Sequence, residues 1–198
     1  LWIGTYDNGI SVFDTKKKTF RNKTFNKNDV KSIGSNAVSD IVCDSRSRIW
    51  VCCQNGYLNE YNQSANNFTR YLSNPYFDYC LSSESISTIY EDKTGNLWIG
   101  SHGNGMYCLN KQKNFFKSYR SFPNVAQSMK NDKITSFVEM DDGKIIVGSD
   151  GGGINIFDPQ KETFETYDVK DGFPSNSIDD LKRGERQTVW VSMWNGGI

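Results

Sequence analysis

The fold is decided by residues 85–119, SISTIYEDKTGNLWIGSHGNGMYCLNKQKNFFKSY. Short runs rich in isoleucine, tryptophan, tyrosine and phenylalanine alternate here with turn-forming residues, first at 93–96 and then at 102–105. Runs of this kind, bounded by glycine, asparagine or aspartate, are typical of strands joined by tight turns. No stretch of the chain has a sustained 3.6-residue apolar period bounded by helix caps. The pattern therefore predicts four short antiparallel strands and an all-β fold.

The same pattern recurs along the whole chain around an anchor residue, which is usually tryptophan. Successive anchors are 48, 48, 48 and 44 residues apart, at Trp2, Trp50, Trp98, Ile146 and Trp190. A glycine follows each anchor by six or seven residues, and a phenylalanine follows each of the first four by eighteen. A repeated four-stranded unit of this length is the pattern of a β-propeller blade, because one small sheet buries its faces only when neighbours stack against it.

We therefore expect a β-propeller fragment built from four-stranded antiparallel blades, a partial propeller that spans 1–198. The expected blade units lie at roughly 1–25, 36–72, 84–120 and 132–168, with the start of a further blade at 176–198. If the ring closed on itself, residues 1–4 and 189–192 would compete for one strand position. This redundancy predicts an excerpt of a larger ring.

The tryptophan anchors are expected to fill the space between blades. Burying each ring would contribute about 3 kcal/mol by area. We expect this packing role for Trp2, Trp50, Trp98 and Trp190.

Composition excludes several function classes. The 198 residues carry 23 Lys and Arg against 23 Asp and Glu, so there is no basic field to hold a nucleic-acid backbone. Mean hydropathy is −0.63, and no apolar run approaches the length that spans a membrane. An aromatic content of 14% is enough for a packed core.

Neither a metal nor another cofactor is expected. The five cysteines form no C-x-x-C pair and the chain has a single histidine, so zinc-ligand spacings are absent. Asp92, Asp141, Asp142 and Asp150 do not form a calcium-binding loop. We expect the cysteines to act as small buried apolar residues, although Cys43 pairing with Cys52 or Cys53 across strands stays open.

Residues 96–110, NLWIGSHGNGMYCLN, preceded by SISTIYEDKTG, resemble the two-component regulator propeller repeat. That repeat pairs an aliphatic residue with an acidic turn ending in glycine, then Leu-Trp-Ile-Gly-Thr or Ser and a glycine-rich bend. Residues 84–119 fit closely, and 1–14 and 132–158 fit well, the latter with Ile146 in place of tryptophan. The copy at 38–68 departs from the pattern, with Cys52 for glycine and a shortened bend at 54–56. The Trp-Asp strand ending of WD40 repeats does not occur.

This resemblance implies the periplasmic sensor region of a membrane-bound hybrid two-component histidine kinase of the Bacteroidetes type. Such sensors resemble two consecutive seven-bladed propellers followed by a β-sandwich, a membrane helix and a cytoplasmic kinase. Members similar to this chain detect an oligosaccharide and switch on the genes that use the parent polysaccharide. The segment itself is then expected to be no enzyme. Kinase activity, the membrane helix and the remaining blades and domains belong to the parent sensor, which is expected to be a homodimer.

Candidate ligand contacts come from loops at one end of the propeller. In a four-stranded antiparallel blade, the bend between the second and third strands and the link to the next blade emerge on the same face. Sugar recognition needs an aromatic plane together with amides and carboxylates that satisfy hydroxyl groups. From successive blades we expect ligand contacts at Tyr6, Asp7, Asn8, His102, Asn104, Asp150, Trp194 and Asn195.

Trp194 is the most suggestive of these residues, because it lies four residues beyond an anchor, where no packing pattern demands an aromatic side chain. The asparagines and aspartates also have an ordinary role in turns, and this reading stays open beside the functional one. The links add aromatic residues and prolines of their own, namely Pro75, Tyr76, Phe77 and Tyr79 within 73–84, and Phe122 and Pro123 within 121–132.

Two other functions stay open. A propeller face of this composition also suits a non-catalytic protein-interaction scaffold, since both kinds of surface use exposed aromatic and amide side chains. A glycan-active enzyme would need two facing carboxylates, for which Asp7 and Asp150 are the candidates. Nucleophilic catalysis has little support, because no Ser-His or Cys-His constellation is present.

Overall fold

The computed structural model describes residues 1–71, 81, 83, 85–110, 116–186 and 188–198. Nearly all regular structure in these ranges is β-strand, and one 3-10 helix, η1 (Val169–Asp171), is present among them. Within the same ranges, no helix has the length and apolar character needed to cross a membrane. The expected all-β class is confirmed.

The strands form five antiparallel sheets in chain order. The first sheet has three strands, β1 (Trp2–Gly4), β2 (Ile10–Asp14) and β3 (Thr19–Lys23). Three four-stranded sheets follow. The second sheet has β4 (Val38–Cys43), β5 (Ile49–Cys53), β6 (Leu58–Asn62) and β7 (Asn67–Tyr71), and the third has β8 (Ile86–Glu91), β9 (Leu97–Ser101), β10 (Met106–Leu109) and β11 (Phe116–Tyr119). The fourth has β12 (Ile134–Glu139), β13 (Ile145–Ser149), β14 (Gly153–Asp158) and β15 (Thr163–Tyr167). The last sheet has two strands, β16 (Ile178–Arg183) and β17 (Val189–Met193).

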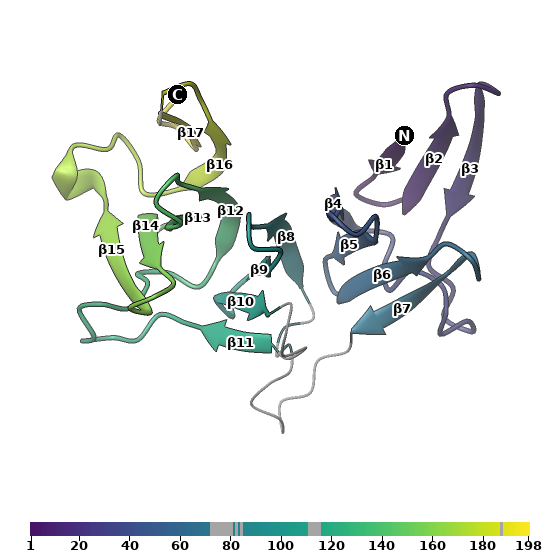
Figure 1. Cartoon of the computed structure of the whole chain (residues 1–198), viewed down its shortest axis with the longest axis horizontal. Helices are drawn as coiled ribbons and strands as arrows, with labels where there is room; N and C mark the ends of the chain where they lie inside the picture. Colours follow the sequence, from purple (N-terminus) through teal and green to yellow (C-terminus); the bar gives the residue numbers. More distant parts are fainter. Residues whose placement is uncertain (72–80, 82, 84, 111–115, 187) are drawn as a thin grey trace.

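The sheets stand side by side as blades of an open arc. Figure 1 shows β4, β8, β12 and β16 along the inside of the arc, with β3, β7, β11 and β15 on the outside. Each of these four inner strands shifts its register once against its neighbour, for example between Ile86 and Thr88 and between Ile134 and Ser136. The predicted β-propeller fragment with four-stranded antiparallel blades is therefore confirmed.

Alternating side chains on each second strand divide between the two neighbouring blades. On β5, Trp50 and Cys52 pack with the blade that follows, whereas Val51 and Cys53 pack with the blade that precedes. This two-residue period is the ordinary geometry of a strand. Because both faces of each complete blade are covered, the core of the molecule is a series of clusters between blades.

Two of the four tryptophan anchors are fully buried in these clusters. Trp50 is 0% and Trp98 2% exposed, and Trp98 meets Phe157 of the next blade edge-on at 5.5 Å. Trp2 is half-buried, with its ring 4.8 Å from that of Tyr61. The expectation for Trp190 is wrong, because its side chain is 63% exposed. In the described chain no sheet packs on the side of β17 that carries it.

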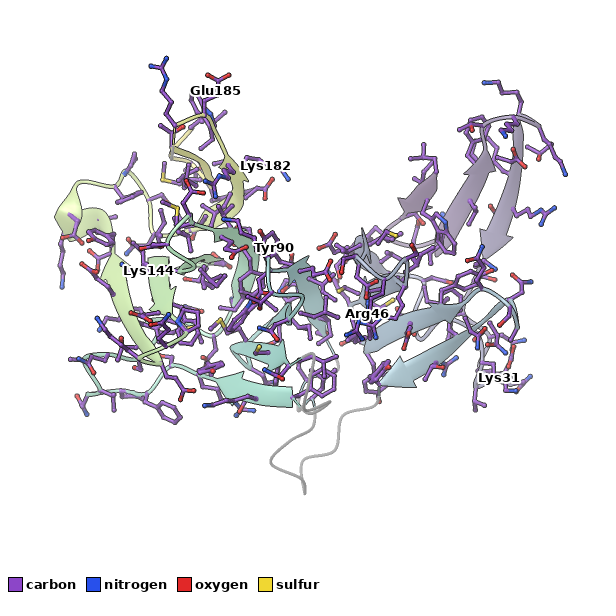
Figure 2. All side chains as sticks on the ribbon, viewed as in Figure 1. Lys31, Arg46, Tyr90, Lys144, Lys182 and Glu185 are labelled. Atoms are coloured by element: carbon purple, nitrogen blue, oxygen red, sulfur yellow. The ribbon has the colours of Figure 1, made fainter. Side chains whose placement is uncertain are left out.

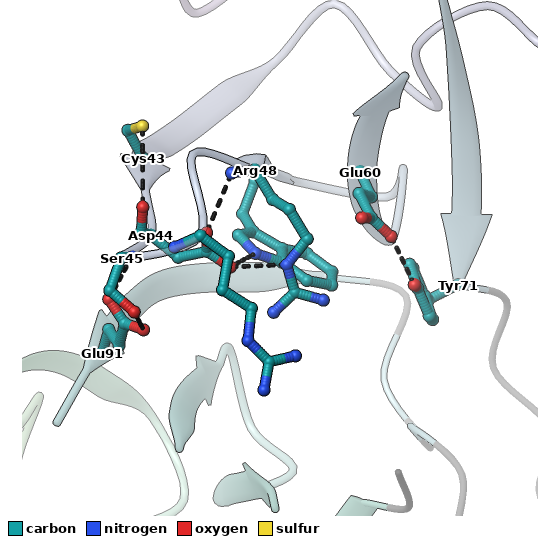
Figure 3. A network of polar contacts seen from close by, with 9 residues as sticks. Cys43, Asp44, Ser45, Arg48, Glu60, Tyr71 and Glu91 are labelled. Atoms are coloured by element: carbon teal, nitrogen blue, oxygen red, sulfur yellow. Dashed lines mark hydrogen bonds and ion pairs between the residues drawn. The ribbon is translucent and has the colours of Figure 1, made fainter. Parts of the chain in front are cut away.

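The acidic turn before each buried tryptophan supplies the acceptor for its indole N–H. Asp44 Oδ2 accepts hydrogen bonds from Trp50 Nε1 at 3.0 Å and from Arg48 Nε at 2.7 Å (Figure 3). Asp92 Oδ2 accepts in the same way from Trp98 Nε1 at 2.9 Å. Buried indole groups usually need such a partner. The aspartate thus has a second role beyond forming the turn.

Polar contacts between consecutive turns join the blades on the face that carries these turns. Glu91 accepts from the amide and hydroxyl of Ser45, at 2.6 and 2.7 Å (Figure 3). Glu139 accepts from the Lys93 amide at 2.9 Å, and Arg183 pairs with Asp141. Each contact joins one blade to the next, so the blades are linked by side-chain chemistry as well as by apolar packing.

Four of the cysteines lie among the described residues, and all four are free. Cys43 lies opposite Ile49, and Cys53 lies opposite Val38, so neither cysteine pairs with another across the strands. Burial raises the pKa of the Cys53 and Cys108 thiols to about 12, which makes both thiols weak nucleophiles. Cys52, Cys53 and Cys108 are buried as the sequence predicted, but the expectation is wrong for Cys43, which is exposed at the end of β4.

Equivalent anchors in different settings give a matched test of blade packing. Trp98→Ala is expected to lower the free energy of unfolding by about 3–5 kcal/mol, because it empties a buried site. Trp190→Ala, at the equivalent position, should cost less than about 1 kcal/mol, because that ring is already exposed. Urea denaturation of both variants measures the difference. Equal losses would contradict the packing argument.

The Asp44 carboxylate gives stability a pH dependence of known sign. Burial alone would raise the pKa of Asp44, but the hydrogen bonds from Trp50 and Arg48 outweigh it and lower the pKa. A lowered folded-state pKa stabilises the protein above the unfolded-state pKa, and this contribution is lost as pH falls through the folded-state pKa. Asp44→Asn should therefore be less stable at pH 7 by about 1 kcal/mol or more.

The deficit of Asp44→Asn should shrink as the pH is lowered from 7 toward about 2, because the wild-type carboxyl becomes protonated as the pH falls through its folded-state pKa. Urea denaturation at the two pH values measures it. Asp179→Asn, at an exposed position on β16, is the control and should behave like the wild type at both. A deficit that does not change with pH would refute the assignment.

Candidate functional site

The bend between the second and third strands is closed by a hydroxyl three residues after the anchor. Thr5 Oγ1 donates to the carbonyl of Gly9 at 2.9 Å, and Ser101 Oγ donates to that of Gly105 at 2.8 Å. Ser149 Oγ does the same with Gly153 at 3.1 Å. These bonds give a physical reason for the threonine or serine that ends the strand motif. In these three bends the hydroxyl fixes the backbone and leaves the side chains to vary, whereas the last sheet has Met193 at the equivalent place.

The blade of β4–β7 has Cys53 at this position and uses a buried amide instead. Asn59, fully buried on β6, donates from Nδ2 to the carbonyls of Gly56 and Tyr57, both at 3.0 Å. Its Oδ1 accepts from the Gly34 amide of the preceding link at 2.9 Å. Sequence analysis did not identify Asn59, since a polar residue inside a strand gives no sign that it is buried.

Each bend lies against the link that leads into the next blade. The amide of Gly9 donates to the Asn36 carbonyl at 2.9 Å, Gly105 donates to Asp132 at 2.9 Å, and Gly153 donates to Asn176 at 2.8 Å. The bends and links of successive blades therefore meet on one face of the arc, as the sequence predicted for this topology.

The fourth residue after each anchor opens the bend and lies beside the residue that precedes an inner strand. The Gln54 amide donates to the Ala37 carbonyl, and the His102 amide donates to that of Ser85. The Asp150 amide donates to the Lys133 carbonyl, and the Trp194 amide donates to that of Ser177. All four distances are 2.9–3.1 Å. We call the surface formed by these openings the rim. The rim consists of Tyr6, Gln54, His102, Asp150 and Trp194 together with the residues that follow them in each bend.

The two aromatic residues at the ends of the rim are open to solvent. Tyr6 is 74% and Trp194 66% exposed, and His102 is also exposed. Trp194 therefore has no packing role among the described residues. Exposed rings of this size on a fixed backbone are available to contact a ligand.

The predicted polar residues are partly engaged with their neighbours. Asp150 Oδ1 accepts from Ser177 Oγ at 2.8 Å, and its Oδ2 lies 3.8 Å from Lys133 Nζ. Asp7 accepts from Asn8 Nδ2 at 2.6 Å. The structure thus adds Gln54, Lys133 and Ser177 to the set that sequence analysis had named.

The two remaining predicted residues have a clear role in the turns. Asn104 is half-buried, and its amide donates to Ser101 Oγ at 3.0 Å. Asn195 is exposed and has a left-handed backbone, with φ of 58°. In the links, Phe122 is 58% exposed. Pro75, Tyr76, Phe77 and Tyr79 lie outside the described residues.

The inner strands line an open polar cavity of about 440 Å³. Hydroxyl groups of β4, β8 and β12 contribute to its wall, together with Asp40 and Asp180. Tyr90 and Lys182, labelled in Figure 2, also line it. Within the described ranges, no three histidine, cysteine, aspartate or glutamate side chains come together as metal ligands would. The cavity wall offers hydrogen bonds to a polar ligand or to water.

Comparison with known proteins gives both a family match and a fold. Residues 80–103 match the family model described as two component regulator propeller. No curated protein sequence matches the chain. Among solved structures, the extracellular domain of the hybrid two component system BT4673 from B. thetaiotaomicron has 18% identity and a TM-score of 0.78, covering 97% of this chain and 26% of that one.

Two further structures extend the comparison. The extracellular domain of the hybrid two component system BT3049 from B. thetaiotaomicron has 21% identity and a TM-score of 0.58, covering 99% of this chain and 31% of that one. Virginiamycin B lyase from Staphylococcus aureus, an enzyme, has 14% identity and a TM-score of 0.67, covering 96% and 58%. At these identities the likeness establishes the β-propeller fold.

The chain spans between a quarter and a third of the length of the two extracellular domains that it resembles, with 26% and 31% covered. The repeat resemblance drawn from the sequence is confirmed by the family match, which falls on the copy that fits the motif best. The chain therefore carries the two component regulator propeller repeat on a β-propeller fold.

Proposed function

We propose that this chain is a ligand-sensing propeller segment of an extracytoplasmic two-component sensor and that its rim binds an oligosaccharide. The observation that carries the proposal is the rim itself. Successive blades bring one side chain each, from Tyr6 to Trp194, to the same face of the arc on backbone bends held by hydrogen bonds. A row of fixed positions with variable side chains suits a ligand that extends across several blades.

The chemistry of the rim matches the needs of a sugar. Tyr6 and Trp194 offer exposed aromatic faces for the apolar side of a pyranose ring. Gln54 and His102 offer both donors and acceptors, and Asp150 accepts a hydrogen bond from Ser177 and lies near Lys133. Side chains that are already oriented lose less entropy when a ligand binds.

In the parent protein, the ligand signal would pass to a cytoplasmic histidine kinase outside this segment and control genes for polysaccharide use. The segment would lie in the periplasm, in an inner-membrane sensor that acts as a homodimer and includes further blades. A ligand shifts such a sensor only if it binds one arrangement better than the other. The family match and the likeness to two extracellular domains of hybrid two component systems support the two-component part of this proposal.

A catalytic role for this segment has less support. Asp7 and Asp150, the candidate carboxylate pair, belong to the first and fourth sheets of the arc, with two complete blades between them. A glycosidase requires its two carboxyl groups about 5–10 Å apart across the scissile bond. A protein-interaction scaffold has no specific observation in its favour and is an outcome of the test below.

The test is a thermal-shift screen of the chain against oligosaccharides from xylan, pectin, chondroitin, mannan and levan, followed by calorimetric titration of any that stabilise it. One of these should raise the melting temperature through preferential binding to the folded state. Trp194→Ala should weaken that binding about tenfold or more, because it removes an aromatic contact.

Trp190→Ala is the matched control, since it removes an exposed tryptophan from the same hairpin but from the blade face rather than the rim. It should leave the affinity unchanged. Equal affinity in Trp194→Ala and the wild type would exclude Trp194 from the site. The absence of any stabilising oligosaccharide would contradict sugar sensing and favour a protein partner.

A further inference from the structure

Tyr57 stands where the other blades have glycine. It is the seventh residue after its anchor, and the equivalent residues are Gly9, Gly105, Gly153 and Gly197. All five have a left-handed backbone, with φ of 63° for Tyr57 and 66–76° for the glycines. This conformation is unfavourable for a bulky side chain and costs about 1–3 kcal/mol unless the surroundings compensate.

In the other blades, the space around this position also excludes a side chain. A Cβ on Gly9, Gly105 or Gly153 would lie 2.2–2.4 Å from the carbonyl oxygen of the facing residue on the outer strand. In the blade of Tyr57 the equivalent facing residue is Tyr71, by the same strand register. Because Tyr57 has a Cβ, the carbonyl of Tyr71 cannot take the place that its counterparts occupy.

The local structure holds Tyr57 in this conformation. Its carbonyl accepts from the Cys53 amide at 3.2 Å and from Asn59 Nδ2 at 3.0 Å. The buried Asn59 amide also binds Gly56 and Gly34, so it fixes the bend on both sides of the tyrosine. Asn55, two residues earlier, also has a left-handed backbone where the next two blades have Gly103 and Gly151.

The position of Tyr57 connects these features to the rim. The residue lies in the same bend as Gln54, between the bends of Tyr6 and His102 along the arc, and its side chain is only half-buried. Strained residues of this kind cluster at ligand clamps.

We propose that Tyr57 is a ligand-contacting residue of the rim, which presents an aromatic ring to a sugar unit between the Tyr6 and His102 bends. This inference rests on the proposed function and deepens it, because it adds a third aromatic contact to those of Tyr6 and Trp194. The strained backbone is the cost of placing a ring where the blade pattern provides only glycine.

The test replaces Tyr57 with glycine, the residue at this position in the other blades. Tyr57→Gly removes the strain and the ring together, so it should weaken binding of the stabilising oligosaccharide about tenfold by calorimetric titration. Its melting temperature should be maintained or rise by about 2–4 °C, because a strained position is relieved. Tyr57→Phe keeps the ring and should bind within about threefold of the wild type.

Lys18→Gly is the control for strain relief alone. Lys18 also has a left-handed backbone, with φ of 56°, but lies in the turn between β2 and β3 on the face opposite the rim. This variant should gain stability without losing affinity. Tyr57→Asn, which tolerates the same backbone, replaces Tyr57→Gly if the glycine variant fails to fold.

Each outcome separates the two proposals. If the wild type binds an oligosaccharide and Tyr57→Gly binds it equally well, Tyr57 is not a contact and the proposed function stands. If both small-residue variants fail to fold, Tyr57 is a packing residue and the inference is wrong. If the wild type binds no oligosaccharide, the proposed function fails and the inference falls with it.

Discussion

The structure depends on an aromatic ring buried between blades together with the polar partner that its N–H requires. Trp50 has Asp44 six residues earlier, and Trp98 has Asp92 at the same spacing. Where Ile146 replaces the tryptophan, the residue six earlier is Met140 rather than an acid. An isoleucine has no donor to satisfy, and a carboxylate without a partner would be costly to bury. At the two buried tryptophans the acid and the indole are therefore two parts of one interaction, whereas the exposed Trp190 has Gly184 at this spacing and no acid.

The blade interfaces determine where the binding surface lies. In the complete blades the second strand is held on both faces, and the bend that follows it is hydrogen-bonded to the link into the next blade. The bend backbone is then closed by Thr5, Ser101 or Ser149, or by Asn59 in the blade where Cys53 replaces the hydroxyl. With the backbone fixed in this way, the side chain four residues after the anchor is free to differ from blade to blade. It is Tyr, Gln, His, Asp and Trp in turn.

The sequence predicted the features that repeat. The 48-residue period and the two-residue alternation around Trp98 were enough to infer blades, their strand order and the face that carries the bends. The exposure of Trp190 was not predictable in the same way, because the motif at that anchor is intact and burial depends on a neighbouring sheet. A repeat pattern specifies what a blade can bury, whereas the neighbours decide what is buried.

The sequence did not predict the features that depart from the repeat. Cys53 and Tyr57 break the pattern of the blades, with a thiol where three others have a hydroxyl and a tyrosine where all the others have glycine, whereas Asn59 has a buried counterpart in Asn155. Their contacts show that they are coupled, since Asn59 replaces the missing hydroxyl and also binds the Tyr57 carbonyl. No local rule predicts this coupling, because it depends on where the outer strand and the Gly34 link approach the bend. The blade that fits the family pattern least is therefore the one in which a strained aromatic residue is held at the rim. A scaffold repeated with fixed spacing needs such exceptions, since identical blades would present identical chemistry at every point of the surface.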